Sequence, residues 1–193
     1  MAEPAADMGA TVTVAPREIH DLAYRACRIA GCDPGTAERI AENVTFAEIH
    51  HGAAVRALCE TLEAADLPTS AWATAPDALL SAEIAARSSG TASATFDPPV
   101  PLASIAASLQ QSLERGVVPA GIDGRVSGAT TVGVVELHSV DPQAGAASRL
   151  RIDEARSDAH RLGIGIDQLW FSRLEAAAAG FLVAETTLDD LDG

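Results

Sequence analysis

The densest group of residues that could transfer protons is the run Glu48-Ile49-His50-His51-Gly52. Glu48 and His51 are three positions apart, so on a helix they share one face. An imidazole ionises near neutral pH and can serve as a general base or as a metal ligand. The alternative is that the two histidines have no catalytic role and lie at a helix C-terminus because the helix dipole favours positive charge there. A di-iron site would need a second Glu-x-x-His motif, which the sequence lacks.

A second candidate pair, Glu136 and His138, lies in the best strand pattern of the chain, residues 130–140. Successive side chains of a strand point to opposite faces, so these two share one face. A neighbouring carboxylate fixes the tautomer of an imidazole and raises its basicity. The alternative is that Glu136 and His138 belong to the polar face of an edge strand and point into water. We expect His51 and His138 to converge in one cavity.

Arg56 follows the two adjacent histidines and is a candidate for binding a substrate carboxylate in a bidentate fork. The alternative is an ion pair with Glu60, four residues later on the same helix face. The cysteines, Cys27, Cys32 and Cys59, form no Cys-x-x-Cys motif, so we interpret them as small buried apolar residues. We expect neither a metal ion nor an organic cofactor.

The composition limits the classes of partner. The 193 residues include 27 acidic and 13 basic ones, which gives a formal net charge of −14. Every basic residue is an arginine, so Schiff-base and P-loop lysine chemistry are excluded. The negative field disfavours nucleic acid and anionic lipid, and no window is apolar enough to span a membrane. The odd number of cysteines, without a targeting signal, indicates a cytoplasmic protein.

The catalytic candidates depend on helices predicted over residues 16–66. The first helix begins at Pro16, a residue favoured in the first turn, and ends at Gly31. The second begins at Asp33, a typical N-cap, and runs to about His51. Gly52 breaks the pattern before a third helix. These elements form an N-terminal helical subdomain.

The rest of the chain predicts a small sheet with more helices. The predicted elements are helices over 77–87, 102–113 and 167–177, and strands over 91–96, 117–122, 130–140, 150–153, 164–166 and 181–184. The fold class is therefore α+β, with the helical subdomain followed by a small mostly antiparallel sheet that has helices on one face. We expect a disordered leader over 1–14, a single domain over 15–185 and an acidic tail over 186–193.

Residues 14–58 resemble the N-terminal helices of the malate/L-lactate dehydrogenase family that has no Rossmann fold. The resemblance rests on Ile29-Ala30-Gly31, Ala37-Glu38, Ala41-Glu42, His50-His51-Gly52 and Arg56. The histidine of that family is catalytic, and by the resemblance this role falls on His51. His50 stands where the family has a serine. The resemblance implies a degenerate relative of the NAD(P)-dependent dehydrogenases.

Most of the chain is also similar to an uncharacterised bacterial family. This similarity rests on the helical opening, the middle segments, and two closing stretches, 170–175 and 181–183. Members of that family end in a tail rich in arginine and glycine, whereas this chain ends in an acidic tail, residues 186–193. The resemblance implies a bacterial protein and no particular reaction.

Together these patterns predict a small cytoplasmic enzyme that acts on a small biosynthetic metabolite by acid–base chemistry, as an isomerase, cyclase or lyase. The predicted site residues are His51 as general base, His50, Glu48, His138 and Glu136 as its partners, and Arg56 as substrate binder. The expected partners are a small-molecule substrate and a second copy of the chain. We expect the protein to bind neither nucleic acid nor membrane. One alternative is a non-catalytic accessory or assembly subunit bound to a partner enzyme, and the other is the degenerate dehydrogenase.

Overall fold

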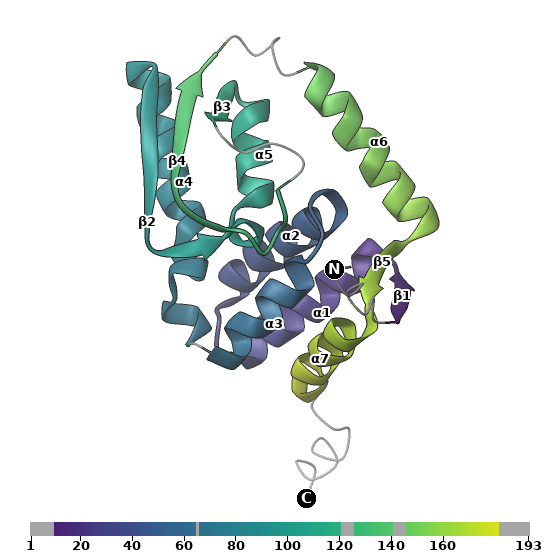
Figure 1. Ribbon diagram of the computed structural model, residues 1–193. Coiled ribbons are helices and arrows are strands. Elements are labelled where there is room, and N and C mark those ends of the chain that lie inside the picture. Colours follow the sequence, from purple (N-terminus) through teal and green to yellow (C-terminus); the bar gives the residue numbers. More distant parts are fainter. Residues whose placement is uncertain (1–9, 65, 121–125, 141–145, 182–193) are drawn as a thin grey trace, which may run out of the picture.

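The structure, a computed structural model, describes residues 10–64, 66–120, 126–140 and 146–181. Within these ranges the chain forms seven α-helices, one three-stranded sheet and one two-stranded sheet (Figure 1). After the short strand β1, four helices precede the larger sheet. The arrangement confirms the α+β class that the order of the sequence patterns predicts.

The first two helices, α1 (Pro16–Ile29) and α2 (Pro34–His50), begin and end where the sequence signals place them. A proline opens each helix, at the position where its missing N–H is not needed. The Asp33 carboxylate accepts hydrogen bonds from two N–H groups of the first turn of α2 and so fixes its start. Gly31, with a φ of 95°, ends α1 in the left-handed conformation that favours glycine.

Helix α2 lies at the centre of the core. It contacts α1, α3 (Ala54–Ala64) and α5 (Ala106–Glu114). The side chains that it buries are mostly small, and they include Ala37, Ile40, Ala41, Val44 and Ala47. Small residues at a helix contact allow the neighbouring helices to approach closely, so one helix can pack against several others.

The larger sheet is antiparallel and has the strand order β2–β4–β3. Its strands are β2 (Thr91–Pro101), β3 (Val117–Ala120) and β4 (Thr131–Ser139). Helix α4 (Ala71–Ser89) and helix α5 cover one face, and Figure 1 shows α4 behind β2 and β4. The alternate residues of β2 and β4 on the other face are exposed. The predicted sheet with helices on one face is therefore confirmed.

Strand β2 is longer than its pattern predicts. We expect Pro98 and Pro99 to end it, but pairing resumes with Val100 opposite Val132. The ladder is irregular between Thr95 and Val100, and the bond before Pro98 is cis. Because the prolines lie in this irregular stretch, their missing N–H groups do not break the ladder.

A two-stranded antiparallel sheet joins the start of the described chain to its last third. Strand β1 (Thr11–Val14) pairs with β5 (Ile164–Asp167). The prediction of a disordered leader over 1–14 is therefore wrong for β1, while residues 1–9 lie outside the described ranges. The run Thr-Val-Thr-Val is an alternating β-branched pattern, which favours a strand and which the interpretation as a leader overlooked.

Helix α6 (Ala146–Leu162) replaces the strand predicted over 150–153. The apolar positions in that stretch are too few to distinguish a strand from a helix. The surrounding sequence is rich in charged residues at helical spacing, and Arg161 pairs with Asp158 at 2.9 Å on one face of α6. The charged residues on either side of 150–153, rather than the apolar residues within it, indicated the correct structure, which is a helix.

The last helix, α7 (Gln168–Ala178), begins at its predicted N-cap, because the Asp167 carboxylate accepts a hydrogen bond from the first turn at 2.8 Å. A 3₁₀ turn, η4 (Ala179–Phe181), follows it, so the strand predicted over 181–184 does not begin at Phe181. The remainder of that strand and the acidic tail lie outside the described ranges. Within those ranges, no helix is both long enough and apolar enough to cross a membrane.

Candidate functional site

The predicted catalytic run at the end of α2 sends its side chains in three directions. Glu48 is turned toward the first turn of α3. His50 lies in a cleft beside α6, and His51 contacts the segment that precedes β4. Neighbours in the sequence therefore belong to different environments, and each is described on its own below.

Glu48 caps helix α3. Its side chain is buried, with the residue 7% exposed, and Oε2 accepts a hydrogen bond from the Val55 N–H at 2.8 Å. Burial raises the pKa of this carboxyl, and hydrogen bonds from backbone N–H groups at the start of α3 partly oppose the rise. Gly52 and Ala53, with φ values of 67° and 56°, turn the chain back so that α3 starts against Glu48. We interpret Glu48 as a structural cap.

His51 holds a loop against the end of α2. Its Nδ1 lies 2.9 Å from the carbonyl oxygen of Val126, so Nδ1 carries the proton and donates it. Burial lowers the pKa of His51, and the bond to Val126 partly opposes this effect. In the same loop, the Gly128 N–H donates to the Gly52 carbonyl at 3.0 Å, and a Cβ on Gly128 would lie only 2.6 Å from that oxygen.

Glu136 and His138 do not reach this region. Both are exposed on the outer face of β4, while the alternate side chains of the strand point into the core. His138 lies near the far end of β4, about 23 Å along the extended strand from Thr131. The loop that contacts His51 precedes Thr131. The predicted convergence of His51 and His138 in one cavity is therefore wrong, and the polar face in water is the arrangement found.

Arg56 is engaged by neighbouring side chains. Its Nε lies 2.8 Å from Glu60 Oε1, in the ion pair that the spacing predicts as the alternative to substrate binding. Its guanidinium also lies 5.5 Å from the centre of the Trp170 ring, and Arg173 lies 4.7 Å from the same ring. Arg56 and Glu48 line one cavity of about 320 Å³, but both groups already have partners there.

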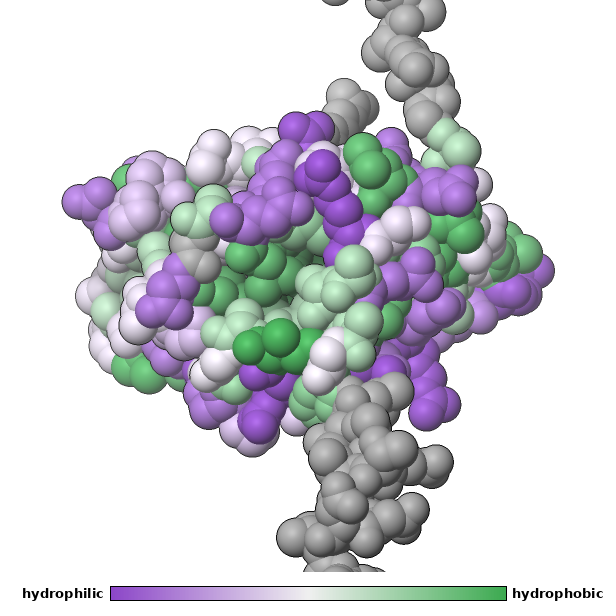
Figure 2. Space-filling view, turned by 90° about the horizontal axis from the view of Figure 1, so that it is seen from below, coloured by the Kyte–Doolittle hydropathy of each residue, from purple (hydrophilic) through white to green (hydrophobic). Residues whose placement is uncertain are grey.

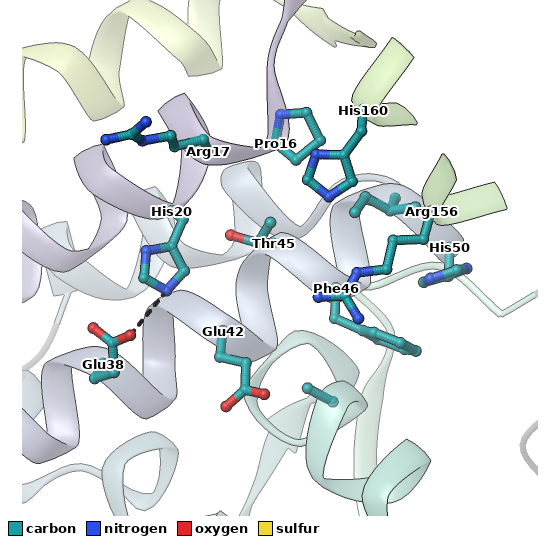
Figure 3. Close-up of a pocket in the computed structure, with 12 residues that line it drawn as sticks. Pro16, Arg17, His20, Glu38, Glu42, Thr45, Phe46, His50, Arg156 and His160 are labelled. Atoms are coloured by element: carbon teal, nitrogen blue, oxygen red, sulfur yellow. Dashed lines mark ion pairs between the residues drawn. The ribbon is translucent and has the colours of Figure 1, made fainter. Parts of the chain in front are cut away.

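A different cleft gathers ionisable groups from three helices (Figure 3). It has a volume of about 360 Å³, within the range of small-molecule sites. We name it the α1–α2–α6 cleft, and its ionisable lining residues are Arg17, His20, Glu38, Glu42, His50, Arg156 and His160. Three of the five histidines of the chain are therefore at one site, and only one of them belongs to the predicted set.

Pairing of β1 with β5 explains why residues far apart in sequence meet in this cleft. One residue, Ala15, separates β1 from α1, and one residue, Gly163, separates α6 from β5. Antiparallel pairing therefore brings the first turn of α1 beside the last turn of α6. Gly163, with a φ of 79°, makes the turn from α6 into β5, and a Cβ there would lie 2.5 Å from Thr13 Cγ2. Arg17 and His160 thus line the same cleft.

One face of α2 forms the floor of the cleft. Glu38, Glu42, Phe46 and His50 recur every four residues, so they follow one another along that face. The Phe46 and His50 rings are in contact, with centroids 4.2 Å apart and planes inclined by 39°. The floor therefore changes from carboxylates at its N-terminal half to an aromatic ring and an imidazole at its C-terminal end.

His20 and Glu38 form a histidine–carboxylate pair at the mouth of the cleft. His20 Nε2, on α1, lies 3.4 Å from Glu38 Oε1, on α2 (Figure 3). The two side chains are 34% and 60% exposed, so solvent and small molecules reach them. A carboxylate at this distance orients the imidazole, as the partner of a catalytic histidine does.

Two buried polar atoms in the cleft wall have no hydrogen-bond partner among the residues that the structure describes. They are Thr45 Oγ1 and His50 Nε2. Burial lowers the pKa of His50 to about 4, and His51 and Arg156 add to the effect. The His50 ring is therefore neutral at pH 7, and its Nε2 can accept or donate one hydrogen bond, according to its tautomer.

Helix α6 supplies the opposite wall. Arg156 and His160 are four residues apart and therefore lie on one face of α6. Figure 3 shows Arg156 extending toward Phe46 and His160 lying above the floor, while the Arg17 side chain turns away from the centre. Arg156 is thus the arginine placed to contact a molecule bound in the middle of the cleft.

The cysteines are buried, as their interpretation as small apolar residues predicts, and all three are free thiols. Burial raises the pKa of the Cys59 thiol to about 12. Within the described ranges, no group of three or more histidine, cysteine, aspartate or glutamate side chains is arranged to hold a metal ion.

Most of the cleft residues lie outside the predicted site. The available signals were the four-residue spacings of Glu38 with Glu42 and of Arg156 with His160. Such spacings usually mark a helix face in contact with water, so they do not identify a site on their own. What makes them a site is the pairing of α6 with α1 and α2, which the sequence pattern does not specify.

Comparison with known proteins adds no family to this geometry. No protein-family model, no curated protein and no solved structure matches the chain. The resemblances to the malate/L-lactate dehydrogenase family and to the uncharacterised bacterial family stay predictions, so a functional assignment has to rest on the α1–α2–α6 cleft.

Proposed function

We propose that this protein is a cytoplasmic enzyme that binds a small metabolite in the α1–α2–α6 cleft and transfers protons on it. The reaction class is isomerisation, cyclisation or elimination, none of which needs a redox partner. His50 and His20 carry the proton transfer, and Arg156 binds an anionic group of the metabolite. The site thus moves from His51, Glu136 and His138 to residues that line one cavity.

The observation that carries the proposal is the pair of unsatisfied atoms in the cleft wall. A buried donor or acceptor without a partner costs about 1–3 kcal/mol, so such atoms are rare in proteins. Thr45 and His50 both line the cleft, and the structure describes no protein partner for Thr45 Oγ1 or for His50 Nε2. A metabolite with a hydroxyl or carboxyl group would supply both hydrogen bonds.

The environments of the two histidines suit different steps. His50 is neutral at pH 7 because burial lowers its pKa to about 4, so its free nitrogen can accept a proton. The proton is held only briefly, since the same burial disfavours the charged ring. His20 faces water and is oriented by Glu38 at 3.4 Å, so it can exchange protons with solvent. Arg156 would hold the substrate anion by charge-assisted hydrogen bonds.

Imidazole NMR tests binding. We expect succinate or inorganic phosphate to shift the ring resonances of His50 and His160, which line the cleft, and to leave those of His138 unchanged. Exposed His138 is the internal control, because it feels any general effect of salt. Equal shifts at all three histidines, or none in the cleft, would contradict the proposal.

Hydrogen exchange tests catalysis without knowledge of the substrate. A proton-transfer enzyme incorporates deuterium from heavy water into its substrate even when the overall equilibrium is unfavourable. We expect a panel of small carboxylates, incubated with the protein in heavy water, to contain at least one compound that gains deuterium. His50→Ala should abolish the gain and His138→Ala should preserve it. Deuterium uptake that survives in His50→Ala would reject the assigned role.

An accessory or assembly subunit is the second candidate function. The observation that favours it is the exposure of Leu80 and Ile84, which lie one turn apart on α4 and are 47% and 59% exposed. Exposed apolar neighbours of this kind are typical of contact surfaces. A pull-down from the native host with the wild type beside Leu80→Ser/Ile84→Ser tests whether this face binds a partner enzyme in stoichiometric amount. Equal recovery of a partner by the wild type and the variant, or of none by the wild type, would remove this candidate surface.

A further inference from the structure

We infer that the molecule bound in the α1–α2–α6 cleft is a zwitterion, with an ammonium group at one end, a carboxylate at the other and a short hydrocarbon chain between them. The inference rests on the proposed function, since it names the substrate class of the same cleft. It comes from the way in which charge is divided along α2 and α6.

The acidic pole of the cleft is formed by Glu38 and Glu42. They are four residues apart and share the face of α2 that forms the floor. Gln111 Nε2, from α5, donates to Glu42 Oε1 at 3.0 Å and so orients that carboxylate. Glu38 is oriented by His20. Carboxylates held in this way can bind an ammonium group through charge-assisted hydrogen bonds.

The basic pole lies on the other side of the cleft and is formed by Arg156 and His160 of α6. Figure 3 shows both side chains toward the upper right of the view, and Glu38 and Glu42, at the N-terminal half of the floor, toward the lower left. Arg156 is close enough to His50 to help lower its pKa, which places the guanidinium near the C-terminal end of α2. A carboxylate bound there would also lie beside His50 and the Thr45 hydroxyl.

The distance between the poles sets the length of the ligand. Glu42 and His50 are eight residues apart on α2, which corresponds to about 12 Å along the helix axis. Phe46 and Ile49 line the floor between the two ends, and Ala107 adds an apolar contact from α5. A ligand that reaches both poles therefore needs several carbons between its charged groups, and those carbons would cover an apolar surface.

The electrostatics of the protein favour a zwitterion over a simple anion. The chain has a formal net charge of −14, and the cleft itself contains two carboxylates. A simple anion can bind to Arg156, but this field makes its binding weaker than that of a zwitterion. An ammonium group on the same molecule removes the net charge of the ligand and gives the Glu42 carboxylate an oppositely charged partner in addition to Gln111.

Calorimetry with three matched probes tests the inference on the wild-type protein. 6-Aminohexanoate has both charged groups, hexanoate lacks the ammonium and hexylamine lacks the carboxylate. Because each charge-assisted bond contributes about 1.5–3 kcal/mol, we expect 6-aminohexanoate to bind about tenfold or more tightly than either analogue. Equal affinity for 6-aminohexanoate and hexanoate would overturn the inference.

Two variants assign the poles. Glu42→Gln should lower the affinity for 6-aminohexanoate to that for hexanoate, and Arg156→Gln should lower it to that for hexylamine. Arg161→Gln is the matched control, since Arg161 lies on α6, pairs with Asp158 and is not part of the cleft lining. A loss in Arg161→Gln equal to that in Arg156→Gln would also overturn the inference. Thermal melts of all three variants separate lost binding from lost folding.

The outcomes distinguish this inference from the proposed function. Tight binding of hexanoate with no effect of Glu42→Gln would reject the zwitterion but leave an anion site, with succinate still shifting His50. If none of the three probes binds and succinate moves no cleft histidine, both the inference and the proposed function fail. Deuterium uptake into an amino acid, but not into its deaminated analogue, would support both.

Discussion

Histidine and carboxylate side chains lie next to each other in two regions of the molecule, the α1–α2–α6 cleft and the outer face of β4. In the cleft, His20 and Glu38 come from different helices, and the half-buried His50 lies on the same floor. On β4, Glu136 and His138 come from one strand and face water. Both regions have a histidine beside a carboxylate, but among the described residues the cleft alone adds partial burial, an arginine and a volume that can hold a ligand. Adjacency along a strand therefore says little about a site until the covering elements are known.

The rate of catalysis gives the strongest test of the difference between the α1–α2–α6 cleft and the outer face of β4. We expect His50→Ala to lower the rate of deuterium exchange by about 10²–10⁴-fold, the usual contribution of a general base, whereas His138→Ala leaves it unchanged. NMR detection of deuterium in the substrate measures both variants under the same conditions. A large loss in His138→Ala would show that the two regions do not differ in the way proposed.

The next largest effect is on the pH dependence of stability. The folded-state pKa of His50 is about 4, below its ordinary value of 6.5, so the unfolded chain binds this proton first as the pH falls. The stability contributed by neutral His50 is present above pH 6.5 and is lost progressively down to about pH 4. Urea unfolding at pH 7.5 and 4.5 should show that wild type loses about 2–3 kcal/mol more than His50→Asn.

Exposed His138 provides the control for this measurement. His138→Asn should keep the wild-type difference between the two pH values, because its ring is in water on β4. His51 also has a lowered pKa, but it is present in wild type and in both variants, so its contribution is largely removed by the subtraction. Identical pH dependence in wild type and His50→Asn would contradict the burial of His50.

A pair of glycines compares the loop at the end of α2 with strand β4. A Cβ on Gly128 would lie 2.6 Å from the Gly52 carbonyl oxygen, so Gly128→Ala must separate the loop from the end of α2. A Cβ on Gly133 of β4 would meet nothing closer than Pro99, at 3.7 Å. We expect Gly128→Ala to lower the free energy of unfolding by about 1–3 kcal/mol and Gly133→Ala to leave it nearly unchanged. Denaturant titration measures both, and a neutral Gly128→Ala would show that the loop is not held at this point.

The smallest effects belong to the outer face of β4. Glu136→Gln and His138→Asn should each change the free energy of unfolding by less than about 0.5 kcal/mol, as surface substitutions do. Urea titration at pH 7.5 measures this. A loss of more than about 1 kcal/mol from either variant would mean that the face is covered by a partner in solution.

Local signals in the sequence predict much of the fold. Pro16, Gly31 and the Asp33 cap locate α1 and α2, because caps depend only on neighbouring residues. Alternation along β4 correctly pairs Glu136 with His138 on one face, but it does not say which face the helices cover. Which face is covered depends on α4 and α5, which lie elsewhere in the sequence. Because these helices cover the face opposite Glu136 and His138, the predicted cavity shared with His51 does not form.

The site was harder to predict, because its walls meet only through tertiary contacts. His50 was among the predicted residues since it lies in a run of ionisable residues. His20 and His160 each lie alone among charged residues, and no pattern links them to one another. Their meeting depends on the pairing of β1 with β5, and the interpretation of β1 as part of a leader concealed it.

The β1–β5 pairing has a practical consequence for protein production. A boundary drawn at Pro16, the first helical residue, would delete the strand that holds the end of α6 beside the start of α1. The shortened chain would keep the core around α2 yet lose the hydrogen bonds that set the width of the cleft. A purification tag is therefore best joined before Thr11 through a flexible spacer, and a shortened protein that folds but binds nothing should not be taken as evidence against a ligand.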